Sequence, residues 1–414
     1  MDEAAAHAKT IVVLGGYGRA GSAVAEQLLA STACRVVIAG RRRAPAEMEA
    51  ARLRRGCAPG RVTARVVDVR SVSDLDRAFG RCAAAVVAVP LRNGASEVAE
   101  AALRAGIHYL DINPDGGRYS ADRCSADRCS ADSYSASDRI SERARRRGVT
   151  FLLQAGAIPG CPSALVRWAG CLLDEVTRVR IASLYRDPAM SEGSISDIVA
   201  HTAKRPLAYK GGAWRPASRL AFRRIDFGAP FGRTTCAPIP LDELKGLPER
   251  MGLAHLAAYQ AGMGGASDAV LLLWGLLGLG RTAGGRRLGT RLMLLAQKLA
   301  PSPSGLVLKL EAMGRRGRRP VQAAARLAHS DMYRATAIPV AAALVQLLRG
   351  KLAPGVHRMG HAVQPRPFLE QLERLGMQVA RAARPRGSKR SEKGRCPTLG
   401  DRAPCWATGE EVSF

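Results

Sequence analysis

The sequence predicts an α/β fold in which a doubly wound, Rossmann-type parallel sheet is joined to a second, α+β domain with a mostly antiparallel sheet. Three observations lead to this prediction. Short apolar runs alternate with helical patterns over the first 155 residues, a glycine-rich turn follows the first run, and polar–apolar alternation marks the later chain. Because 414 residues exceed what one compact core usually holds, we expect two domains and a tail.

The first domain is expected to contain six strands, each a short apolar run followed by a turn signal. These runs are 11–14, 34–39, 62–67, 83–89, 107–110 and 149–153. Apolar residues at helical spacing lie between them, and the expected helices are 19–30, 47–55, 73–79, 95–105 and 139–147. Most of the runs are apolar throughout rather than alternating, so helices should cover both faces of this sheet.

Residues 120–139 interrupt this alternation with a decaying repeat of the pentapeptide SADRC. A period of five fits neither a helix nor a strand, so we expect a low-complexity surface insertion. Cys124 and Cys129 in the repeat are spaced wrongly for a zinc knuckle and have no nearby histidine. His357 and His361 lack a third ligand, so no metal site is expected.

Alternation resumes in the second half of the chain. It predicts a hairpin over 207–216 around Gly211 and Gly212, a helix over 194–203, an apolar helix over 338–349, and strands over 176–186, 219–226, 305–313 and 321–332. The domain limits that follow are 1–165 for the dinucleotide-binding domain, 166–355 for a substrate and dimerisation domain, 356–382 for a segment that could return to the first domain, and 383–414 for a disordered basic tail.

The net charge of +28 lies mostly after residue 280. Such asymmetry can mark a surface for nucleic acid or anionic membrane. Arginine far outnumbers lysine, however, and alanine and glycine are abundant, which favours a coding bias. No aromatic residues are interleaved with the basic clusters, so we expect no specific nucleic-acid partner.

An apolar run over 269–279 is too short to cross a bilayer, which takes about 20 residues. Its length favours a buried helix or a dimer face over contact with a membrane surface. The chain begins Met-Asp-Glu with no apolar stretch before Ile11, and its ten cysteines suggest no disulfide framework. We therefore expect a cytoplasmic protein.

A G-x-G-x-x-G motif stands where the first strand passes into the first helix. Gly16 allows the tight turn, Gly18 lets the backbone approach a pyrophosphate, and Gly21 lets helix and strand pack closely. The helix N-terminus would then face the anion with its N–H groups and dipole. The cofactor-binding residues expected here are Gly16, Tyr17, Gly18, Arg19, Ala20 and Gly21.

The end of the second strand favours NADP over NAD. An NAD site usually has an acidic residue there, whereas this chain has Gly40 followed by three arginines. Arg41 and Arg42 could bind a 2′-phosphate, and Arg43 could be merely solvated. Further along the expected ligand crevice, Asp68 either flanks the adenine or caps a turn. Val89 and Pro90 end the fourth strand, beside the nicotinamide half.

These segments, taken together, resemble the saccharopine dehydrogenase-like family over residues 10–380, apart from the repeat. The resemblance rests on LGGYGRAG at 14–21, IAGRR at 38–42, HYLD at 108–111, GAIPGCPS at 156–163, and the DMY run at 331–333 with the apolar helix behind it. It implies an NADP-binding oxidoreductase whose second domain shapes the substrate cleft and often mediates dimerisation. The catalytic groups are not fixed across that family.

Candidate proton carriers come from the expected strand ends and the second domain. Asp111 follows the fifth strand and either faces the crevice or caps a turn. His201 lies early in the second domain and could face the cleft. The sequence thus favours an NAD(P)-dependent oxidoreductase whose small substrate could be derived from an amino acid. A non-catalytic or membrane-associated nucleotide-binding protein on the same fold is the alternative.

Overall fold

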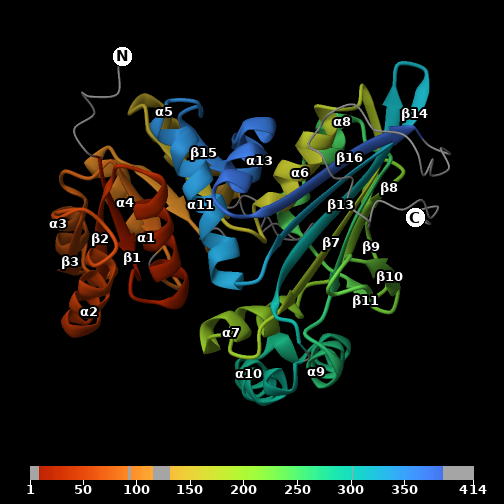
Figure 1. Cartoon of the computed structure of the whole chain (residues 1–414), viewed down its shortest axis with the longest axis horizontal. Helices are drawn as coiled ribbons and strands as arrows, with labels where there is room; N and C mark the ends of the chain where they lie inside the picture. The colour runs from red at the N-terminus through yellow and green to blue at the C-terminus, as the bar shows by residue number, and fades with distance from the viewer. Residues whose placement is uncertain (1–8, 92–94, 115–130, 301, 386–414) are drawn as a thin grey trace. The chain divides into compact units, whose positions relative to one another are not determined.

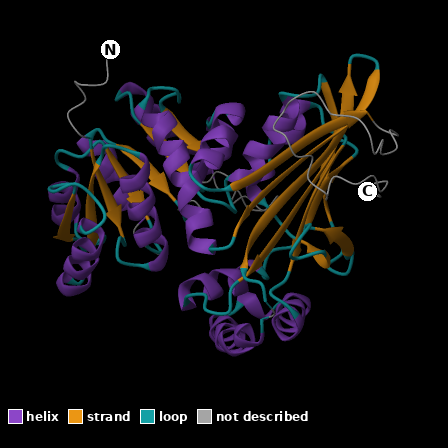
Figure 2. Cartoon of the chain, in the orientation of Figure 1, coloured by secondary structure: helices purple, strands orange, loops and turns teal. Residues whose placement is uncertain are grey.

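The computed structural model describes residues 9–91, 95–114, 131–300 and 302–385 (Figure 1). Contacts divide the chain into two units, each built on one sheet: the first is Met1–Cys161 with Tyr333–Leu375, and the second is Pro162–Met332 with Gly376–Phe414. The first sheet is parallel and the second is mixed but mostly antiparallel (Figure 2). The predicted fold class is confirmed.

The parallel sheet has seven strands in the order β15-β6-β5-β4-β1-β2-β3. Their bounds are β1 Thr10–Leu14, β2 Arg35–Gly40, β3 Val62–Val66, β4 Ala84–Val87, β5 His108–Asp111, β6 Thr150–Leu153 and β15 Gly355–Arg358. Six of them match the predicted runs. The seventh, β15, comes from far along the chain and pairs with β6, with Val356 opposite Phe151.

Helices cover this sheet because its strands are apolar on both sides. They are α1 Arg19–Ser31, α2 Arg43–Arg54, α3 Val72–Phe79, α4 Ala95–Ala105, α5 Ala131–Arg146 and α11 Met332–Leu348, with the short α12 Met359–Ala362 and α13 Pro365–Arg374. One face packs Val12, Leu14 and Phe151 against α3, α4 and α5 in a single core. α1 lies against β1 and β2.

Two predictions made for the low-complexity segments are wrong in part. α5 begins at Ala131, so the later part of the repeat is helical rather than an irregular insertion. A helix nucleated by packed residues can propagate into a segment with no apolar period, since each added residue closes a hydrogen bond. Residues 383–385, expected to belong to a disordered tail, form the end of β16. Cys124, Cys129 and residues 386–414 lie outside the described residues.

The second sheet has the order β10-β11-β12-β7-β13-β14-β16, and β8 pairs with both β12 and β9. The strands are β7 Glu175–Arg186, β8 Leu207–Lys210, β9 Ala213–Pro216, β10 Arg223–Asp226, β11 Arg233–Pro238, β12 His255–Ala261, β13 Gly305–Arg316, β14 Arg319–His329 and β16 Gln378–Pro385. The predicted hairpin turn is confirmed: Gly211 and Gly212 have φ of +55° and +83°, which glycine adopts without strain.

The other elements of the second unit are helical. They are α6 Cys161–Gly170, α7 Glu192–His201, η3 Asp242–Leu244, α8 Leu247–Met251, α9 Gly265–Leu277, η4 Leu279–Arg281, α10 Ala283–Ala296 and η5 Gln297–Leu299. The apolar run 269–279, expected to be a buried helix or a dimer face, lies mostly in α9 and is not wholly buried, because Leu273, Leu276 and Leu277 are exposed. Within the described parts of the chain, no helix is both long and apolar enough to cross a membrane.

Two boundaries in the late chain also differ from prediction. The strand expected over 321–332 ends at His329, and the helix expected from 338 begins at Met332. Pro339 lies inside α11, seven residues after its first residue. The apolar pattern alone placed the start too late, because Arg334 and Thr336 interrupt the apolar residues of the first two turns.

Candidate functional site

The glycine loop between β1 and α1 has a backbone that side chains would disrupt. The N–H groups of Gly15 and Gly16 donate to the carbonyl of Ala39 at 2.8 and 3.1 Å, which ties the loop to β2. A Cβ on Gly21 would lie 2.2 Å from the Gly15 oxygen. Gly18 precedes α1, and no side chain caps the helix there. The N-terminus of α1 can therefore receive an anion.

The end of β2 places Tyr17 and the arginines beside this loop. A Cβ on Gly40 would lie 2.3 Å from the Tyr17 ring, so glycine is needed for the ring to sit there. The Arg42 N–H donates to the Tyr17 hydroxyl at 3.4 Å, and its guanidinium lies 5.7 Å from the ring centroid. Arg43 instead pairs with Glu47 at 3.5 Å.

Arg41 and Arg42 are exposed, and neither guanidinium forms an ion pair with any residue that the structure describes. The sequence ends β2 with Gly40 and continues without a carboxylate until Glu47. Two cations that lack an ion-pair partner among the described residues therefore lie next to the glycine loop. A phosphate group can accept several hydrogen bonds from such guanidinium groups.

The carboxylate of Asp68, the next predicted residue, accepts hydrogen bonds within its own turn. Its carboxylate accepts from the backbone N–H of Arg70 at 3.0 Å and from the Arg70 guanidinium at 2.8 Å. These hydrogen bonds lower the pKa of Asp68 to about 2, with a smaller contribution from Arg41. The observed contacts are those of a turn aspartate, and its contact with adenine stays a prediction.

The ends of β4 and β5 continue the same edge of the sheet. A Cβ on Gly15 would lie 2.7 Å from the Ala88 oxygen, so the chain after β4 passes directly by the glycine loop. The Asn113 amide donates to the Val89 carbonyl at 3.1 Å and to Asp111 at 2.6 Å. Val89 is half-buried and Pro90 is exposed.

Asp111 is fully buried at the end of β5. Its carboxylate accepts from the Asn113 backbone N–H at 2.8 Å, which makes a turn of the Asx type, and from the Tyr109 hydroxyl at 3.4 Å. Burial raises the pKa of Asp111 to about 6, although the hydrogen bonds from Asn113 and Tyr109 oppose the rise. The carboxyl group can thus hold or release a proton near neutral pH.

Gln154 follows β6 at the same edge and was not singled out by its sequence. It has a φ of +57°, and its amide donates to the Pro114 carbonyl at 2.8 Å. Its Oε1 atom is buried and has no hydrogen-bond partner among the described residues. A buried acceptor without a donor is costly, so this edge has an unfilled polar position. Only the fold could reveal it.

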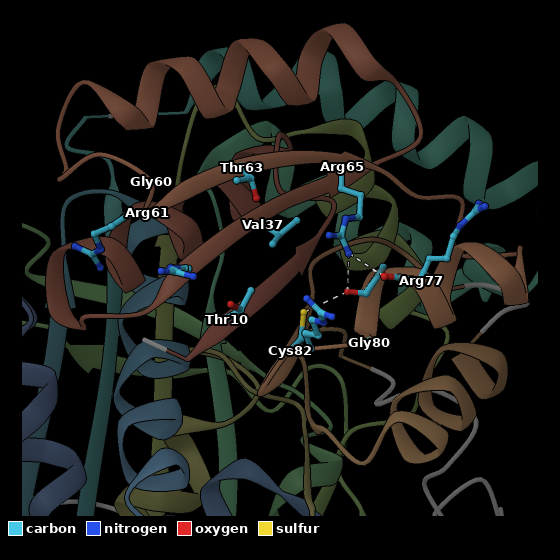
Figure 3. Close-up of a pocket in the computed structure, with 12 residues that line it drawn as sticks. Thr10, Val37, Gly60, Arg61, Thr63, Arg65, Arg77, Gly80 and Cys82 are labelled. Carbon is cyan, nitrogen blue, oxygen red and sulfur yellow. Dashed lines mark hydrogen bonds between the residues drawn. The ribbon is translucent and has the colours of Figure 1, made fainter. Parts of the chain in front are cut away.

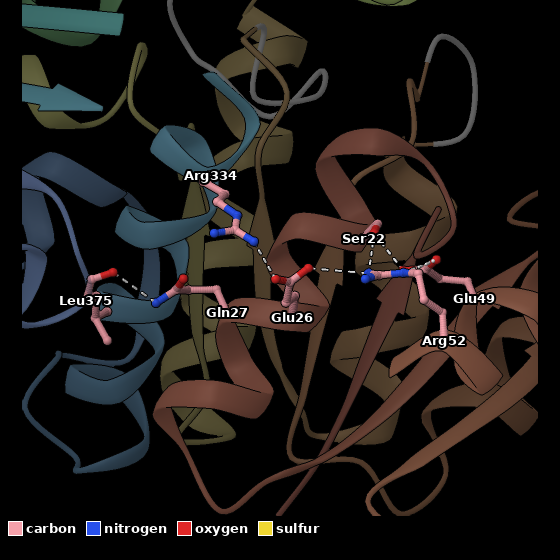
Figure 4. A network of polar contacts seen from close by, with 7 residues as sticks. All are labelled: Ser22, Glu26, Gln27, Glu49, Arg52, Arg334 and Leu375. Carbon is pink, nitrogen blue, oxygen red and sulfur yellow. Dashed lines mark hydrogen bonds and ion pairs between the residues drawn. The ribbon is translucent and has the colours of Figure 1, made fainter. Parts of the chain in front are cut away.

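A polar network fixes α1, whose first residues form the loop (Figure 4). Arg52 of α2 donates to Glu49 at 2.8 Å and to Ser22 of α1 at 3.1 Å. Glu26 of α1 pairs with Arg52 at 3.4 Å and with Arg334 of α11 at 2.7 Å. The helix is therefore held from two sides, which limits movement of its N-terminus.

Arg19 and Ala20 form the first turn of α1. The Arg19 guanidinium stacks over the ring of Tyr333 at 4.2 Å, in the first turn of α11. Stacking of this kind orients a guanidinium without neutralising it. The DMY run of the sequence thus supplies an aromatic ring to the glycine-loop helix.

His201, the second catalytic candidate, is the last residue of α7 in the second unit. Its Nε2 atom lies 3.1 Å from the Pro240 carbonyl oxygen. Lys204 nearby pairs with Asp242 at 2.9 Å, and Lys245 pairs with the same carboxylate at 3.0 Å. Asp111 belongs to the first unit, so a joint role for it and His201 stays a prediction.

A cavity of about 330 Å³ lies at the opposite, amino edge of the parallel sheet (Figure 3). Its arginines are Arg35, Arg61, Arg65, Arg77 and Arg81. Arg65 donates to the carbonyls of Arg77 and Ala78 at the end of α3, and Arg77 also pairs with Asp74. This cavity is remote from the glycine loop along the strands and is not the cofactor site.

Comparison with known proteins agrees with these features. Residues 11–152 match the family model of the saccharopine dehydrogenase NADP binding domain. The fold is similar to that of saccharopine dehydrogenase (L-Glu forming) from Saccharomyces cerevisiae, with a TM-score of 0.62 and 14% sequence identity over 90% of this chain and 100% of that chain. No curated protein matches the sequence.

Two further solved structures are more distant. GenD2 from gentamicin A biosynthesis, in complex with NAD, gives a TM-score of 0.41 at 14% identity over 89% of this chain and 92% of that chain. The triphenylmethane reductase of Citrobacter sp., complexed with NADP(H), gives 0.26 at 21% identity over 34% and 48%. Neither adds to the assignment. The resemblance found in the sequence is confirmed: residues 11–152 match the NADP-binding domain of saccharopine dehydrogenase, and the fold of the chain is similar to that of the yeast enzyme.

Proposed function

We propose that this protein is an NADP(H)-dependent oxidoreductase that transfers a hydride between the nicotinamide and a small substrate derived from an amino acid. The observation that carries the proposal is the end of β2, where Arg41 and Arg42 stand unpaired among the described residues beside the glycine loop. No carboxylate stands there to bind a free ribose 2′-hydroxyl, as NAD sites usually require.

The residues present fit a dinucleotide with a 2′-phosphate. The uncapped N-terminus of α1 and the close turn at Gly15–Gly21 suit the pyrophosphate. Arg41 and Arg42 suit the 2′-phosphate, since guanidinium groups can donate two hydrogen bonds to one phosphate. Asp68 is held by Arg70, which leaves the charge of Arg41 largely available.

The bound nicotinamide would supply the hydride chemistry, and the chain's own groups would orient the reactants and move a proton. Asp111 is our candidate for the proton carrier, because its pKa of about 6 suits exchange near neutral pH. His201 is the second candidate. Gln154 offers an unfilled acceptor at the same edge as Asp111. The substrate and a homodimeric assembly remain part of the proposal.

The test is titration of the purified chain with NADPH and NADH, followed by nucleotide fluorescence and calorimetry. We expect NADPH to bind at least about tenfold more tightly, because a 2′-phosphate adds charge-assisted hydrogen bonds. A turnover screen with amino acids, keto acids and their mixtures with ammonia then follows NADPH absorbance. Equal affinity for both nucleotides would remove the NADP assignment, and no binding would remove the whole proposal.

A non-catalytic nucleotide-binding protein on the same fold is the second candidate. It is favoured by one observation: Asp111 already forms a strand-end turn and His201 contacts a backbone carbonyl, as structural residues do. Tight NADPH binding with no turnover on any substrate of the screen would support it. Turnover that is lost in Asp111→Asn with unchanged NADPH affinity would exclude it.

A further inference from the structure

Seven exposed leucines lie on the neighbouring helices α9 and α10 and on the short η5 that follows them, all in the second unit. This leucine face consists of Leu273, Leu276 and Leu277 on α9, Leu288, Leu292 and Leu295 on α10, and Leu299 on η5. Each has between 36% and 76% of its surface exposed. They make up more than half of the large exposed apolar side chains among the described residues. Gathered apolar side chains of this kind mark a contact surface, whereas scattered ones need no explanation.

The four leucines of α10 and η5 repeat at intervals of four, three and four residues, which places them along one side of the helix. The other side is well packed. Met293 belongs to a buried cluster with Trp274 of α9 and Ile195 and Val199 of α7. The Trp274 indole donates to the Gly285 carbonyl at 2.8 Å. The helices are thus fixed by their inner sides, and the leucines point away from a complete core.

α9 and α10 lie with α7 where β7 and β12 end and β13 begins (Figure 1). α10 contacts both α7 and α9. A helical pair at the end of a sheet is free to meet a surface with its outer side. Neither helix is long enough to cross a bilayer, so the contact would be made along the helices.

The stretch of chain that carries the leucine face has charged side chains of one sign only. Residues 269–310 contain no aspartate or glutamate. Arg287, Arg291 and Lys298 are exposed and follow one another at intervals of four and seven, along one flank of the leucine row. None of the three forms an ion pair with any described residue. An exposed apolar stripe with a basic flank is typical of helices that lie in a membrane interface.

Either a second copy of the chain or a lipid bilayer could cover the leucine face, and the charge pattern distinguishes the two. A second copy of the chain, meeting leucine face to leucine face, would bring the cations Arg287, Arg291 and Lys298 of both copies together. A bilayer with anionic headgroups supplies both an apolar interior and the opposite charge. We propose that the leucine face binds the surface of an anionic lipid bilayer, with α9 and α10 lying in the plane of the interface.

The experiment is sedimentation of the full chain with vesicles of phosphatidylcholine alone or with 30% phosphatidylglycerol. One variant is Leu288→Ser/Leu295→Ser/Leu299→Ser, and its control replaces three exposed apolar residues elsewhere, Met48→Ser/Val72→Ser/Leu220→Ser. A second variant is Arg287→Glu/Arg291→Glu/Lys298→Glu. Its control makes the same charge change in the exposed β13–β14 turn, Arg316→Glu/Arg318→Glu/Arg319→Glu. Circular dichroism and NADPH binding check each variant for folding.

We expect binding to the anionic vesicles, at least about tenfold weaker in each leucine-face variant and little changed in each control. High salt should weaken it, because the headgroup attraction is screened. Three results would overturn the proposal: no binding to anionic vesicles, equal binding to both vesicle types, or equal loss in variant and control. Sedimentation velocity tests the alternative, in which the leucine face binds a second copy of the chain. A dimer that the leucine variant dissociates, with no vesicle binding, would assign the face to a second copy.

Discussion

At the amino edge of the parallel sheet, basic side chains donate to the last carbonyls of helices. At the carboxyl edge, two arginines form no ion pair with any described residue. Arg61, Arg65, Arg147 and Lys9 donate to carbonyls at the ends of α1, α3, α4 and α11, respectively. Arg41 and Arg42 stand beside the start of α1. Both edges carry arginines, but the contacts of those arginines differ.

The difference follows from the topology of a parallel sheet. Each crossover helix runs antiparallel to the strands, so helix C-termini collect at the amino edge and helix N-termini at the carboxyl edge. Cations stabilise the negative ends of helix dipoles and are unfavourable near the positive ends. An arginine at the amino edge is thus explained by the fold alone. An arginine at the carboxyl edge needs another anion, and a 2′-phosphate is one.

The largest effect is expected from a substitution that obstructs the glycine loop at the carboxyl edge. Gly21→Val should weaken NADPH binding by more than about 100-fold, because its Cβ would lie 2.2 Å from the Gly15 oxygen and must displace the loop. The matched change at the amino edge is Gly80→Ala, where the nearest atom to a Cβ is 3.4 Å away. Fluorescence titration of both variants measures the effect. Equal affinity in the two would contradict the site.

The second prediction compares arginine pairs. Arg41→Ala/Arg42→Ala should weaken NADPH binding by about 10- to 100-fold and NADH binding far less, since only NADPH carries the 2′-phosphate. Arg35→Ala/Arg81→Ala removes two arginines from the amino-edge cavity and should leave both affinities unchanged. Arg43→Ala is a further control, because Arg43 pairs with Glu47. An equal loss of affinity for NADPH and NADH in Arg41→Ala/Arg42→Ala would mean that these residues do not bind the 2′-phosphate.

The third prediction concerns the buried carboxyl at the carboxyl edge. Burial raises the pKa of Asp111 from 3.8 to about 6, so the folded state binds the proton more tightly than the unfolded state. Its contribution to stability is therefore lost as the pH rises from about 4 to about 6. Relative to wild type, Asp111→Asn should gain about 2 kcal/mol between pH 4.5 and 7.5, measured by urea unfolding. A constant difference would mean that Asp111 titrates normally.

The smallest effect is expected at the amino edge. Arg65→Ala removes two hydrogen bonds to the end of α3 and should lower the free energy of unfolding by about 1 kcal/mol, with NADPH affinity unchanged. Arg81→Ala, in the same cavity, should cost less, because Arg81 makes no such bond among the described residues. A loss of NADPH affinity in Arg65→Ala would show that the two edges are coupled.

Local patterns predicted the first six strands well because each is a buried run with a turn signal behind it. No strand was predicted for β15, since Gly355–Arg358 is a short half-buried segment whose partner, β6, lies some 200 residues earlier. The start of α5 inside the repeat was missed for a related reason: propagation from packed residues overrides a weak local pattern. The apolar run 269–279 predicted a buried helix or a dimer face, and hydropathy cannot distinguish the two, because it reports how apolar a residue is and not what covers it.

The candidate site divides in the same way. The glycine loop and the arginines after β2 are contiguous in sequence, so their spacing alone pointed to a dinucleotide. The turn contacts of Asp111 and the unfilled acceptor of Gln154 depend on strands that meet only in the sheet. The contacts of His201 likewise became visible only with the fold, and its catalytic role stays a prediction.

The sequence by itself determined the nucleotide-binding half of this protein, because glycine spacing, apolar runs and the residues after β2 act within a few positions of one another. The tertiary structure decided which arginines have partners, which carboxyl is buried and which leucines are uncovered. Those properties depend on the neighbours that packing brings from distant parts of the chain. The composition gives the number of arginines. Only the direction of the neighbouring helices, which the fold sets, distinguishes the arginines that stabilise helix ends from those that are available to bind a ligand.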